Sequence, residues 1–257
     1  MRRILSELRS KHPLVHCITN YVTANDCANL LLAAGAVPVM ADAPEETAEI
    51  AARAQALVLN LGTLSESRLQ AMRLAGAAAN RNGIPVVLDP VGVWASQFRQ
   101  SAARALLREI KFAAIRGNAQ EMQSVLEIAS GAPCEPERFD PGELAALART
   151  KVICTGAEDL VTDGGKTFRI TSGDPIQKRI TGAGCMLSAL TGAFLAAENS
   201  VESCAAAVCA MGLAGELAAS RMDTPDGNAS CRNFLIDAVY NMTDEQLEEG
   251  KRLEDLT

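Results

Sequence analysis

The run Ala56-Leu57-Val58-Leu59-Asn60-Leu61-Gly62-Thr63 decides the fold class of this chain of 257 residues. Its first four residues are all apolar, and a polar, glycine-containing loop follows them directly. A strand with one wet face alternates apolar and polar residues, whereas a strand that is apolar throughout is covered on both faces. The run therefore predicts a central strand in a sheet that carries helices on both sides.

The same pattern recurs along the chain, with helix-length segments between the apolar runs. The candidate strands are Leu14–Cys17, Val37–Met40, Ala56–Asn60, Pro85–Leu88, Ala113–Ile115, Lys151–Cys154, Leu160–Thr162 and Phe168–Ile170. The candidate helices are Ile4–Arg9, Val22–Ala34, Glu45–Ala54, Ser65–Arg81, Phe98–Leu107, Ala119–Ile128, Pro141–Ala148, Gly184–Glu198, Val201–Arg221 and Cys231–Asn241. This alternation predicts an α/β fold with a mostly parallel, doubly wound sheet.

We expect one domain over residues 1–257. No linker rich in Pro, Ser or Gly interrupts the alternation, which resumes after the proline-containing loop Gly131–Gly142. After Thr155 the pattern changes. Two short strand runs around Asp163–Gly165 predict a hairpin, and two long helices rich in Ala, Gly and Cys follow it.

The composition excludes several classes of function. A net charge of −7 and 4% aromatic residues leave no basic track or stacking platform, so we expect no nucleic acid partner. The most apolar stretches are about a dozen residues long, below the ~20 that span a bilayer, so we expect no membrane segment. The eight cysteines form no CxxC pair, and the only histidines are His12 and His16. We therefore expect no structural zinc and a reducing, cytoplasmic location.

In a doubly wound sheet, ligands bind beyond the carboxyl ends of the strands. The loops at those ends are Thr19-Asn20-Tyr21, Met40-Ala41-Asp42, Asn60-Leu61-Gly62-Thr63, Asp89-Pro90-Val91-Gly92, Arg116-Gly117-Asn118 and Thr155-Gly156. They are polar or contain glycine where the preceding strands are apolar, which predicts one composite pocket. His16, near the first loop, is interpreted as a half-buried, hydrogen-bonded histidine without a catalytic role.

The run Thr181-Gly182-Ala183-Gly184-Cys185 precedes a long apolar helix. Glycines let the backbone approach a ligand closely, and the first N–H groups of a helix, together with its dipole, attract an anion. The alternative is a turn that merely lets a helix start. The run alone does not decide between the two.

Four other motifs also have two interpretations each. Asn118 is a natural N-cap with Glu121 at the capping-box position, and Glu121 is alternatively a ligand of hydrated Mg²⁺. Asp89 either caps the turn after it or binds the metal that accompanies a phosphate. Arg116 either forms a surface ion pair or holds a phosphate, and Thr155 either ends a strand or belongs to a nucleotide loop.

The order and spacing of these motifs resemble those of the hydroxyethylthiazole kinases. The opening signature of that family is similar to Pro13-Leu14-Val15-His16-Cys17-Ile18-Thr19-Asn20-Tyr21-Val22 and to Ala36-Val37-Pro38-Val39-Met40-Ala41-Asp42-Ala43-Pro44-Glu45-Glu46. The remaining matches, over roughly residues 13 to 240, are Leu59–Leu64, Leu88–Gly92, Ile115–Asn118 and Thr181–Cys185. The last two are shared more widely among ribokinase-like kinases.

The resemblance implies a ribokinase-like fold, ATP and Mg²⁺ as cosubstrate and cofactor, a thiazole alcohol as acceptor, and a homotrimer. The implied thiazole-pocket residues are Asn20, Val22, Met40, Gly62 and Gly182. The implied ATP contacts are Arg116 and Thr155, and the implied metal ligands are Asp89 and Glu121. The implied catalytic residues are Cys185, Gly182 and Gly184, with Cys185 in the place of the usual aspartate base. Near a helix N-terminus its thiol pKa is expected to be lowered.

Several departures from the family pattern and several rival functions bear on this interpretation. The departures lie at Cys17, Asp42, Val93–Ser96 and Thr224–Cys231. The rivals are a kinase for hydroxymethylpyrimidine or pyridoxal, an ADP-forming repair dehydratase on the same fold, and a nucleotide-binding regulator without turnover. Cys185 disfavours the first, because those kinases usually keep an acid there, and the set Asp89, Glu121 and Gly182 disfavours the last.

The substrate needs a cover, because a γ-phosphoryl group exposed to water risks hydrolysis. No extra alternating strand pair is visible between Leu14 and Leu88, so a β-lid inserted early in the chain is not expected. We expect a neighbouring protomer to present Met40 and the turn Ala41–Pro44 instead, across a head-to-tail interface. The alternative is that Met40 packs inside its own core.

Overall fold

The computed structural model describes residues 3–135 and 139–257, and their strands form one sheet in the order β2-β1-β3-β4-β5-β6-β7-β8-β9. Strands β1 to β6 are parallel, and β7, β8 and β9 each run antiparallel to the preceding strand in that order. The strands are β1 (Leu14–Ile18), β2 (Val37–Val39), β3 (Ala56–Asn60), β4 (Val86–Asp89), β5 (Ala114–Asn118), β6 (Lys151–Thr155), β7 (Asp159–Thr162), β8 (Thr167–Ile170) and β9 (Leu253–Asp255).

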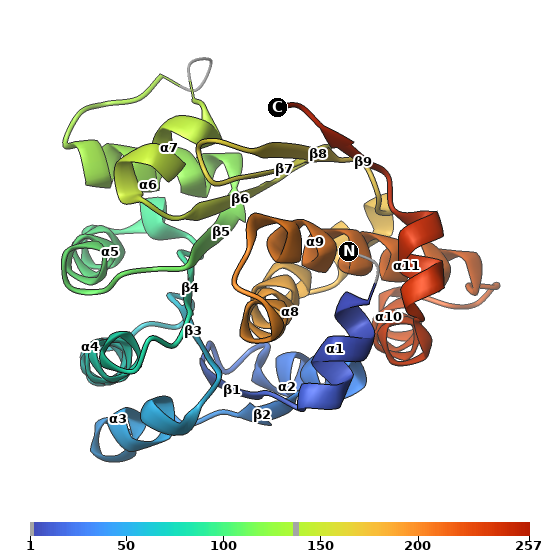
Figure 1. Ribbon diagram of the computed structural model, residues 1–257, viewed down its shortest axis with the longest axis horizontal. Coiled ribbons are helices and arrows are strands. Elements are labelled where there is room, and N and C mark those ends of the chain that lie inside the picture. Colours follow the sequence, from blue (N-terminus) through green and yellow to red (C-terminus); the bar gives the residue numbers. More distant parts are fainter. Residues whose placement is uncertain (1–2, 136–138) are drawn as a thin grey trace.

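Helices cover both faces of the sheet (Figure 1), which confirms the doubly wound prediction. One layer consists of α3 (Pro44–Arg53), α4 (Glu66–Arg81), α5 (Gln97–Glu109), α6 (Ala119–Ser130) and α7 (Pro141–Ala148). The other consists of α1 (Ile4–Lys11), α2 (Ala24–Ala34), α8 (Ala183–Ala197), α9 (Val201–Ser220), α10 (Asn228–Asn241) and α11 (Asp244–Gly250). Short 3-10 helices, η1 (Val93–Ala95) and η3 (Pro175–Arg179), lie in loops.

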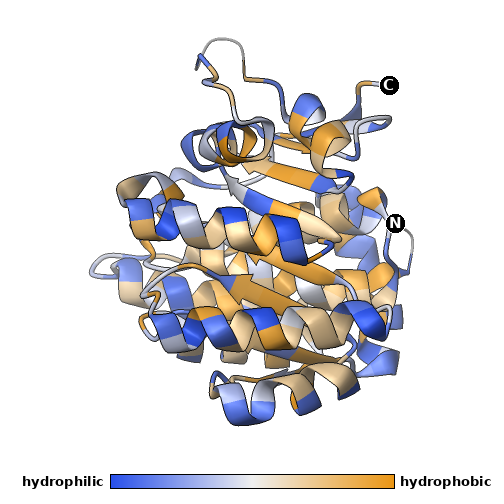
Figure 2. Cartoon of the chain, turned by 90° about the vertical axis from the view of Figure 1, so that its left-hand side faces the viewer, coloured by the Kyte–Doolittle hydropathy of each residue, from blue (hydrophilic) through white to orange (hydrophobic). Residues whose placement is uncertain are grey.

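Strand β3 is apolar throughout because it faces two cores. Ala56 and Val58 pack in the core that α8 and α9 cover, whereas Leu57 and Leu59 pack in the core that α4 and α5 cover. Successive side chains of a strand point to opposite faces, so no position before Asn60 reaches water. Figure 2 shows the same arrangement, with hydrophobic strands behind helices that carry hydrophilic stripes.

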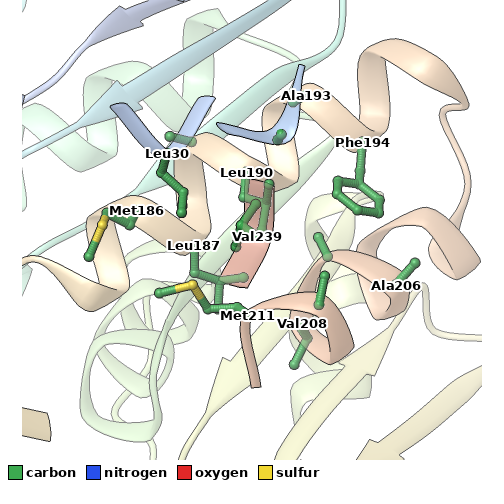
Figure 3. Close-up of a cluster of buried hydrophobic side chains, with 14 of the residues drawn as sticks. Leu30, Met186, Leu187, Leu190, Ala193, Phe194, Ala206, Val208, Met211 and Val239 are labelled. Atoms are coloured by element: carbon green, nitrogen blue, oxygen red, sulfur yellow. The ribbon is translucent and has the colours of Figure 1, made fainter. Parts of the chain in front are cut away.

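The larger core is built around α8 and α9, the two helices that are rich in small residues. Leu30 of α2, Leu190 of α8 and Val239 of α10 converge in it (Figure 3). Helix α9 matches the predicted helix Val201–Arg221 to within one residue. It is long and apolar enough to cross a membrane by length and composition, but 78% of its most apolar window is buried inside the protein. Core helices can be as long and as apolar as membrane spans, and the burial of α9 identifies it as a core helix.

Several predicted boundaries differ from the structure. Helix α2 begins at Ala24 rather than at Val22, and β5 extends to Asn118, so that Arg116 lies in a strand and not in a loop. The hairpin is confirmed, since β7 and β8 pair antiparallel. Helix α11 and strand β9 were not predicted, and β9 adds to the edge of β8. All eight cysteines are free.

Candidate active site

The polar loops meet at the carboxyl ends of the parallel strands. The sheet register places Asn60 opposite Asp89 at the ends of β3 and β4. It places Asn118 opposite Thr155 at the ends of β5 and β6. Residues from distant parts of the chain are thereby brought to the edge at which the sequence predicts a composite pocket.

The glycine turn forms the N-terminus of α8 at this edge. Gly182 has φ +85°, a left-handed conformation that favours glycine. A Cβ at Gly182 would lie 2.3 Å from Thr23 Cγ2, and a Cβ at Gly184 would lie 2.3 Å from Arg116 Nη1. Gly182 is therefore required by conformation and by contact, whereas a side chain at Gly184 would displace the guanidinium of Arg116. The guanidinium of Arg116 lies directly over the first turn of α8.

Arg116 is held at this place by its strand and by its neighbour. Its Nη2 donates to Thr155 Oγ1 at 2.8 Å, and Thr155 Oγ1 donates to the carbonyl of Gly117 at 3.3 Å. Its Nε is buried and has no partner in the described part of the chain. A guanidinium with an unused donor beside a helix N-terminus can bind an anion together with that helix.

A cavity of about 620 Å³ opens beside this guanidinium. Three predicted site residues line it, namely Arg116, Thr155 and Gly184, and the other predicted residues do not. The volume is in the range of small-ligand sites, about 300–1,000 Å³. The cavity thus brings together only these three of the predicted site residues.

Asn118 and Gly156 of the predicted strand-end loops also line the cavity, whereas another part of its wall was not predicted. That part includes Thr171, Ser172, Gly173, Gln177, Met211 and Gly212. The first three follow β8, which runs in the same direction as β6 because both are antiparallel to β7. A polar loop with a glycine therefore ends β8 at the same edge of the sheet. The pattern used for the other strand ends was present there and would have found Thr171, Ser172 and Gly173, but not Gln177, Met211 or Gly212.

Cys185 lies in a buried hydrogen-bond network at the ends of three strands. Its Sγ accepts from Asn20 Nδ2 and from Asn60 Nδ2, each at 3.3 Å. Asn60 Nδ2 also donates to Asp89 Oδ2 at 2.8 Å, and Ser188 Oγ donates to the same oxygen at 2.7 Å. The network joins the first turns of α8 to β1, β3 and β4. Asn60 and Ser188 had been given no role from the sequence.

Burial raises the pKa values of both acidic groups in this network. It raises the pKa of Asp89 to about 6, against the opposing effects of Arg116 and of hydrogen bonds from Ser188 and Asn60. Burial is also the main cause of the raised pKa of Cys185, and the charge of Asp89 adds to it. The expectation that the helix N-terminus lowers the pKa of this thiol is therefore wrong. Cys185 is a neutral thiol near pH 7.

Glu121 forms the capping box that its spacing predicts. Its Oε2 accepts from the N–H of Asn118, and Asn118 Oδ1 accepts from the N–H of Glu121, both at 2.9 Å. The other oxygen, Oε1, accepts from the N–H of Gly92 at 2.9 Å. Glu121 therefore also ties the loop after β4 to α6.

Asp89 and Glu121 fit a magnesium ion that is shared with phosphates. Both carboxylates are buried, and Glu121 is close enough to help raise the pKa of Asp89. Asp89 Oδ1 is buried and has no partner among the described residues, although a carboxylate oxygen needs one. No cluster of three or more His, Cys, Asp or Glu side chains occurs in residues 3–135 and 139–257. Mg²⁺ in phosphate sites commonly uses only one or two carboxylates.

The predicted thiazole-pocket residues are brought together only in part. A Cβ at Gly62 would lie 2.9 Å from Asn20 Cβ, so these two residues are in contact. Asn20 Oδ1 accepts from both the N–H and the hydroxyl of Thr23 at 3.1 Å, and its Nδ2 bonds are used within the network. Its side chain therefore has no spare polar group. Val22 is 58% exposed, and Met40 is half-buried against the larger core.

His16 holds the loop after β2 that contains Met40. It is fully buried rather than half-buried, and its Nε2 lies 2.7 Å from the carbonyl oxygen of Ala41. Its Nδ1 has no partner in the part of the chain that the structure describes. Burial lowers the pKa of the ring. In the same loop, Asp42 forms an ion pair with Arg68 at 2.7 Å.

Comparisons with known proteins agree with each other over nearly the full chain. The model of the "Hydroxyethylthiazole kinase family" matches residues 5–245. The hydroxyethylthiazole kinase of Clostridium acetobutylicum is 41% identical over 271 residues, which are 99% of each protein. That of Methanoculleus marisnigri is 46% identical over 98% of this chain and 92% of its own length.

Solved structures show the same relationship. The hydroxyethylthiazole kinase protein of Pyrococcus horikoshii OT3 superposes with a TM-score of 0.92 at 36% identity, over 99% of this chain and 98% of that one. The pyridoxal kinase of Staphylococcus aureus in complex with pyridoxal has a TM-score of 0.65 at 14% identity, over 94% of this chain and 97% of that one. The second likeness shows the fold alone, which is ribokinase-like.

Proposed function

The chain belongs to the hydroxyethylthiazole kinase family, and we propose that it transfers the γ-phosphoryl group of ATP to the primary hydroxyl of hydroxyethyl-methylthiazole. One observation carries the proposal. The guanidinium of Arg116 lies between Thr155 Oγ1 and the glycine turn of α8, beside a cavity of about 620 Å³. A polyphosphate requires a positively charged binding site with several hydrogen-bond donors, whereas a neutral alcohol does not.

The chain stabilises the transferring group by position and charge. Phosphoryl transfer passes through a loose transition state whose charge is spread over the oxygens of the transferring group. Arg116 and Thr155 bind the phosphates, and N–H groups at the start of α8 form the anion hole. Gly182 permits the left-handed turn that starts α8, and Gly184 leaves room for the guanidinium of Arg116 over that turn.

Asp89 and Glu121 would hold Mg²⁺, which when bound neutralises charge on the phosphates. Two hydrogen bonds occupy Asp89 Oδ2, and Oδ1 remains available as a ligand. Glu121 is fixed by its capping box and by the N–H of Gly92. Both carboxylates are therefore in place before a metal arrives.

Cys185 orients the acceptor hydroxyl beside the pocket formed by Asn20, Val22, Met40 and Gly62. A thiol with a raised pKa is a poor base near pH 7. A loose transition state requires little removal of the alcohol proton before the new bond forms. Orientation of the hydroxyl, rather than its deprotonation, is therefore the role that suits Cys185.

We also propose that residues 1–257 act as one kinase domain in a cytoplasmic homotrimer. Large hydrophobic side chains are exposed on the segment that leads to the edge strand β2, namely Tyr21, Val22, Leu32 and Val37. An unpaired edge strand beside exposed apolar groups favours contact with another copy. The unpaired cysteines fit a reducing compartment.

A panel assay tests the proposed function. Purified protein with ATP and Mg²⁺ is offered the thiazole alcohol, hydroxymethylpyrimidine and pyridoxal, and the phosphorylated products are measured. The thiazole phosphate should form fastest, and a chelator should abolish its formation. Arg116→Lys, which keeps the charge but loses the forked donors, should raise the KM for ATP more than that for the alcohol. Phosphorylation of another alcohol, with no thiazole phosphate above background, would refute the proposal.

A further inference from the structure

We propose that Asn60 is a positioning residue for the transfer reaction, because its side-chain amide fixes Cys185 and Asp89 relative to the alcohol pocket. The inference rests on the proposed function and adds to it a residue that touches neither substrate. Asn60 is the last residue of β3 and is only 1% exposed. It is the first polar residue after the apolar run of that strand.

The amide of Asn60 makes every hydrogen bond that it can form. Its Oδ1 accepts from Asn20 Nδ2 at 3.1 Å and from the N–H of Gly62 at 2.9 Å. Its Nδ2 donates to Asp89 Oδ2 at 2.8 Å and to Cys185 Sγ at 3.3 Å. A primary amide has two donor hydrogens and two acceptor positions. None is left for a ligand, so Asn60 acts through its neighbours.

The orientation of this amide is fixed by its partners. The backbone N–H of Gly62 can only donate, and the Asp89 carboxylate can only accept while it is ionised. A flipped amide would set its NH₂ group against Gly62 and its carbonyl against Asp89. In a buried site both mismatches would leave polar groups unpaired. Asn60 therefore has one orientation, which makes it suitable as a fixed reference for the site.

The two ends of the amide serve two parts of the reaction. The carbonyl end contacts Asn20 and Gly62, which belong to the proposed alcohol pocket. The NH₂ end contacts Asp89, the proposed metal ligand, and Cys185, which faces the acceptor hydroxyl. One side chain thus fixes the proposed alcohol pocket relative to the proposed metal ligand and to the thiol that faces the acceptor hydroxyl.

The connection continues beyond Asn20 to the glycine turn. Asn20 Oδ1 accepts from the N–H and the hydroxyl of Thr23. The side chain of Thr23 packs on Gly182, where an added Cβ would lie 2.3 Å from its Cγ2. A displacement of Asn60 would therefore reach the anion hole as well as the pocket.

Two substitutions at Asn60 separate the two ends of its amide. Asn60→Asp keeps both acceptor bonds, loses both N–H donors and sets a second carboxylate against Asp89 Oδ2. We expect kcat to fall about 10- to 100-fold, as for partners of metal ligands. The KM for the alcohol should change less than about threefold, because the pocket side is retained. Asn60→Leu removes both ends, so the KM for the alcohol should rise as well. Thermal unfolding under assay conditions reports the folded fraction.

Ser188→Ala is the matched contrast, because it removes the other donor to Asp89 Oδ2 and leaves both donors to Cys185 in place. Its loss of kcat should be smaller than that of Asn60→Asp. An equal loss would show that the effect runs through Asp89 alone and would overturn the inference. So would an Asn60→Asp variant with the kcat of the wild type, or losses that follow the unfolded fraction alone. A wild-type protein inactive on the thiazole alcohol would instead refute the proposed function.

Discussion

At the scale of single residues, the site depends on side chains whose hydrogen-bonding capacity is used entirely inside the protein. Asn20 and Asn60 each donate to Cys185 Sγ. Neither amide keeps a free polar atom. The sulfur is therefore positioned by two amides whose own orientations are fixed by further hydrogen bonds. Such support keeps the geometry of a site constant before a ligand binds.

Replacement of Cys185 by serine should leave measurable activity. The serine hydroxyl can accept from the same two amides, and the loose transition state asks little of a base. We expect a reduced kcat, measured with saturating ATP and alcohol. A Cys185→Ser variant as inactive as one with a blocked glycine turn would contradict this and would make the thiol essential.

Replacement of Gly182 by alanine should abolish activity and lower stability. The left-handed conformation alone costs a Cβ-bearing residue about 1–2 kcal/mol, and the new methyl group would overlap Thr23. The contact with Thr23, rather than the space needed by the phosphoryl group, is the direct obstacle. Denaturant unfolding and turnover measure the two effects.

Gly83→Ala is the control for this substitution. Gly83 also has a left-handed φ of +68°, but nothing lies within 4 Å of an added Cβ. The Gly83→Ala substitution should lower the free energy of unfolding only by the cost of the left-handed conformation, and it should leave kcat unchanged. Equal losses of stability at the two glycines would show that the packing against Thr23 is unimportant.

His16 should make the protein less stable below about pH 6.5. Burial lowers the ring's pKa in the folded state, against weaker opposing effects of the hydrogen bond to the Ala41 carbonyl and of the charge of Glu46. The ordinary pKa of a histidine ring is 6.5. Below this pH the ring of the unfolded chain therefore binds a proton that the ring of the folded chain excludes. Stability is independent of this ring above that pH. It falls by up to about 1.4 kcal/mol per pH unit as the pH decreases towards the lowered pKa.

Urea unfolding of His16→Gln between pH 7.5 and 5 measures this contribution. The variant should show a shallower decrease than the wild type. His12→Gln, which leaves His16 in place, should keep the steep decrease, and these are the only two histidines in the chain. Parallel curves for His16→Gln and the wild type would show that the ring is not held neutral.

At the scale of helices and strands, the apolar runs predicted the elements that have two covered faces. Ala56–Asn60 is a strand with the predicted bounds, because its side chains divide between two cores. Strand β9 was not predicted, since Leu253-Glu254-Asp255 is short and acidic, and both of its acidic residues are exposed. Its pairing depends on the exposed edge of β8 and not on its own residues.

The candidate site likewise contains parts that could be predicted from the sequence and parts that depend on neighbouring elements. Loops at strand ends could be predicted, because the α/β alternation fixes where they meet. The Asn60 network could not, since it depends on the sheet order that sets Asn60 opposite Asp89. The direction of the Cys185 pKa was also missed, because burial of the thiol is a property of packing around α8.

Strand β9 should support the cavity beside Arg116, where we propose that ATP binds. Arg252, just before it, accepts from the N–H of Thr171 and donates its own N–H to Ser172 Oγ, both at 3.0 Å. Its side chain contacts Glu216, which accepts from the N–H of Gly173 at 2.7 Å. Deletion of residues 252–257 should raise the KM for ATP about tenfold, the equivalent of one or two lost hydrogen bonds. The KM for the alcohol should stay nearly constant.

Arg169→Ala is the control for the deletion. It removes an exposed ion pair with Glu254 across β8 and β9 but keeps the contacts of Arg252. Exposed pairs contribute about 0–1 kcal/mol, so the KM for ATP should remain close to that of the wild type. Equal increases in both KM values after the deletion would indicate general loss of structure rather than loss of support for this cavity.

At the scale of the whole molecule, a single chain leaves the residues of the proposed alcohol pocket incompletely enclosed. The cavity beside Arg116 is lined by Thr155 and Gly184 but not by Asn20, Val22, Met40 or Gly62. Val22 is largely exposed, and Met40 is half-buried. A second copy at the β2 edge would cover these residues and exclude water from the transferring group. Sedimentation should therefore show a single species near three times the chain mass of 27.1 kDa.

Mixed trimers should then recover activity from two inactive variants. In a head-to-tail trimer each site combines the glycine turn of one protomer with Met40 of the next. Met40→Asp and Gly182→Val should each abolish activity alone. After subunit exchange, some hybrid sites contain both unaltered parts, so activity should return, rising with the extent of exchange. Mixing either variant with itself is the control. A monomer with full activity, or exchanged trimers without recovered activity, would show that each chain completes its own site.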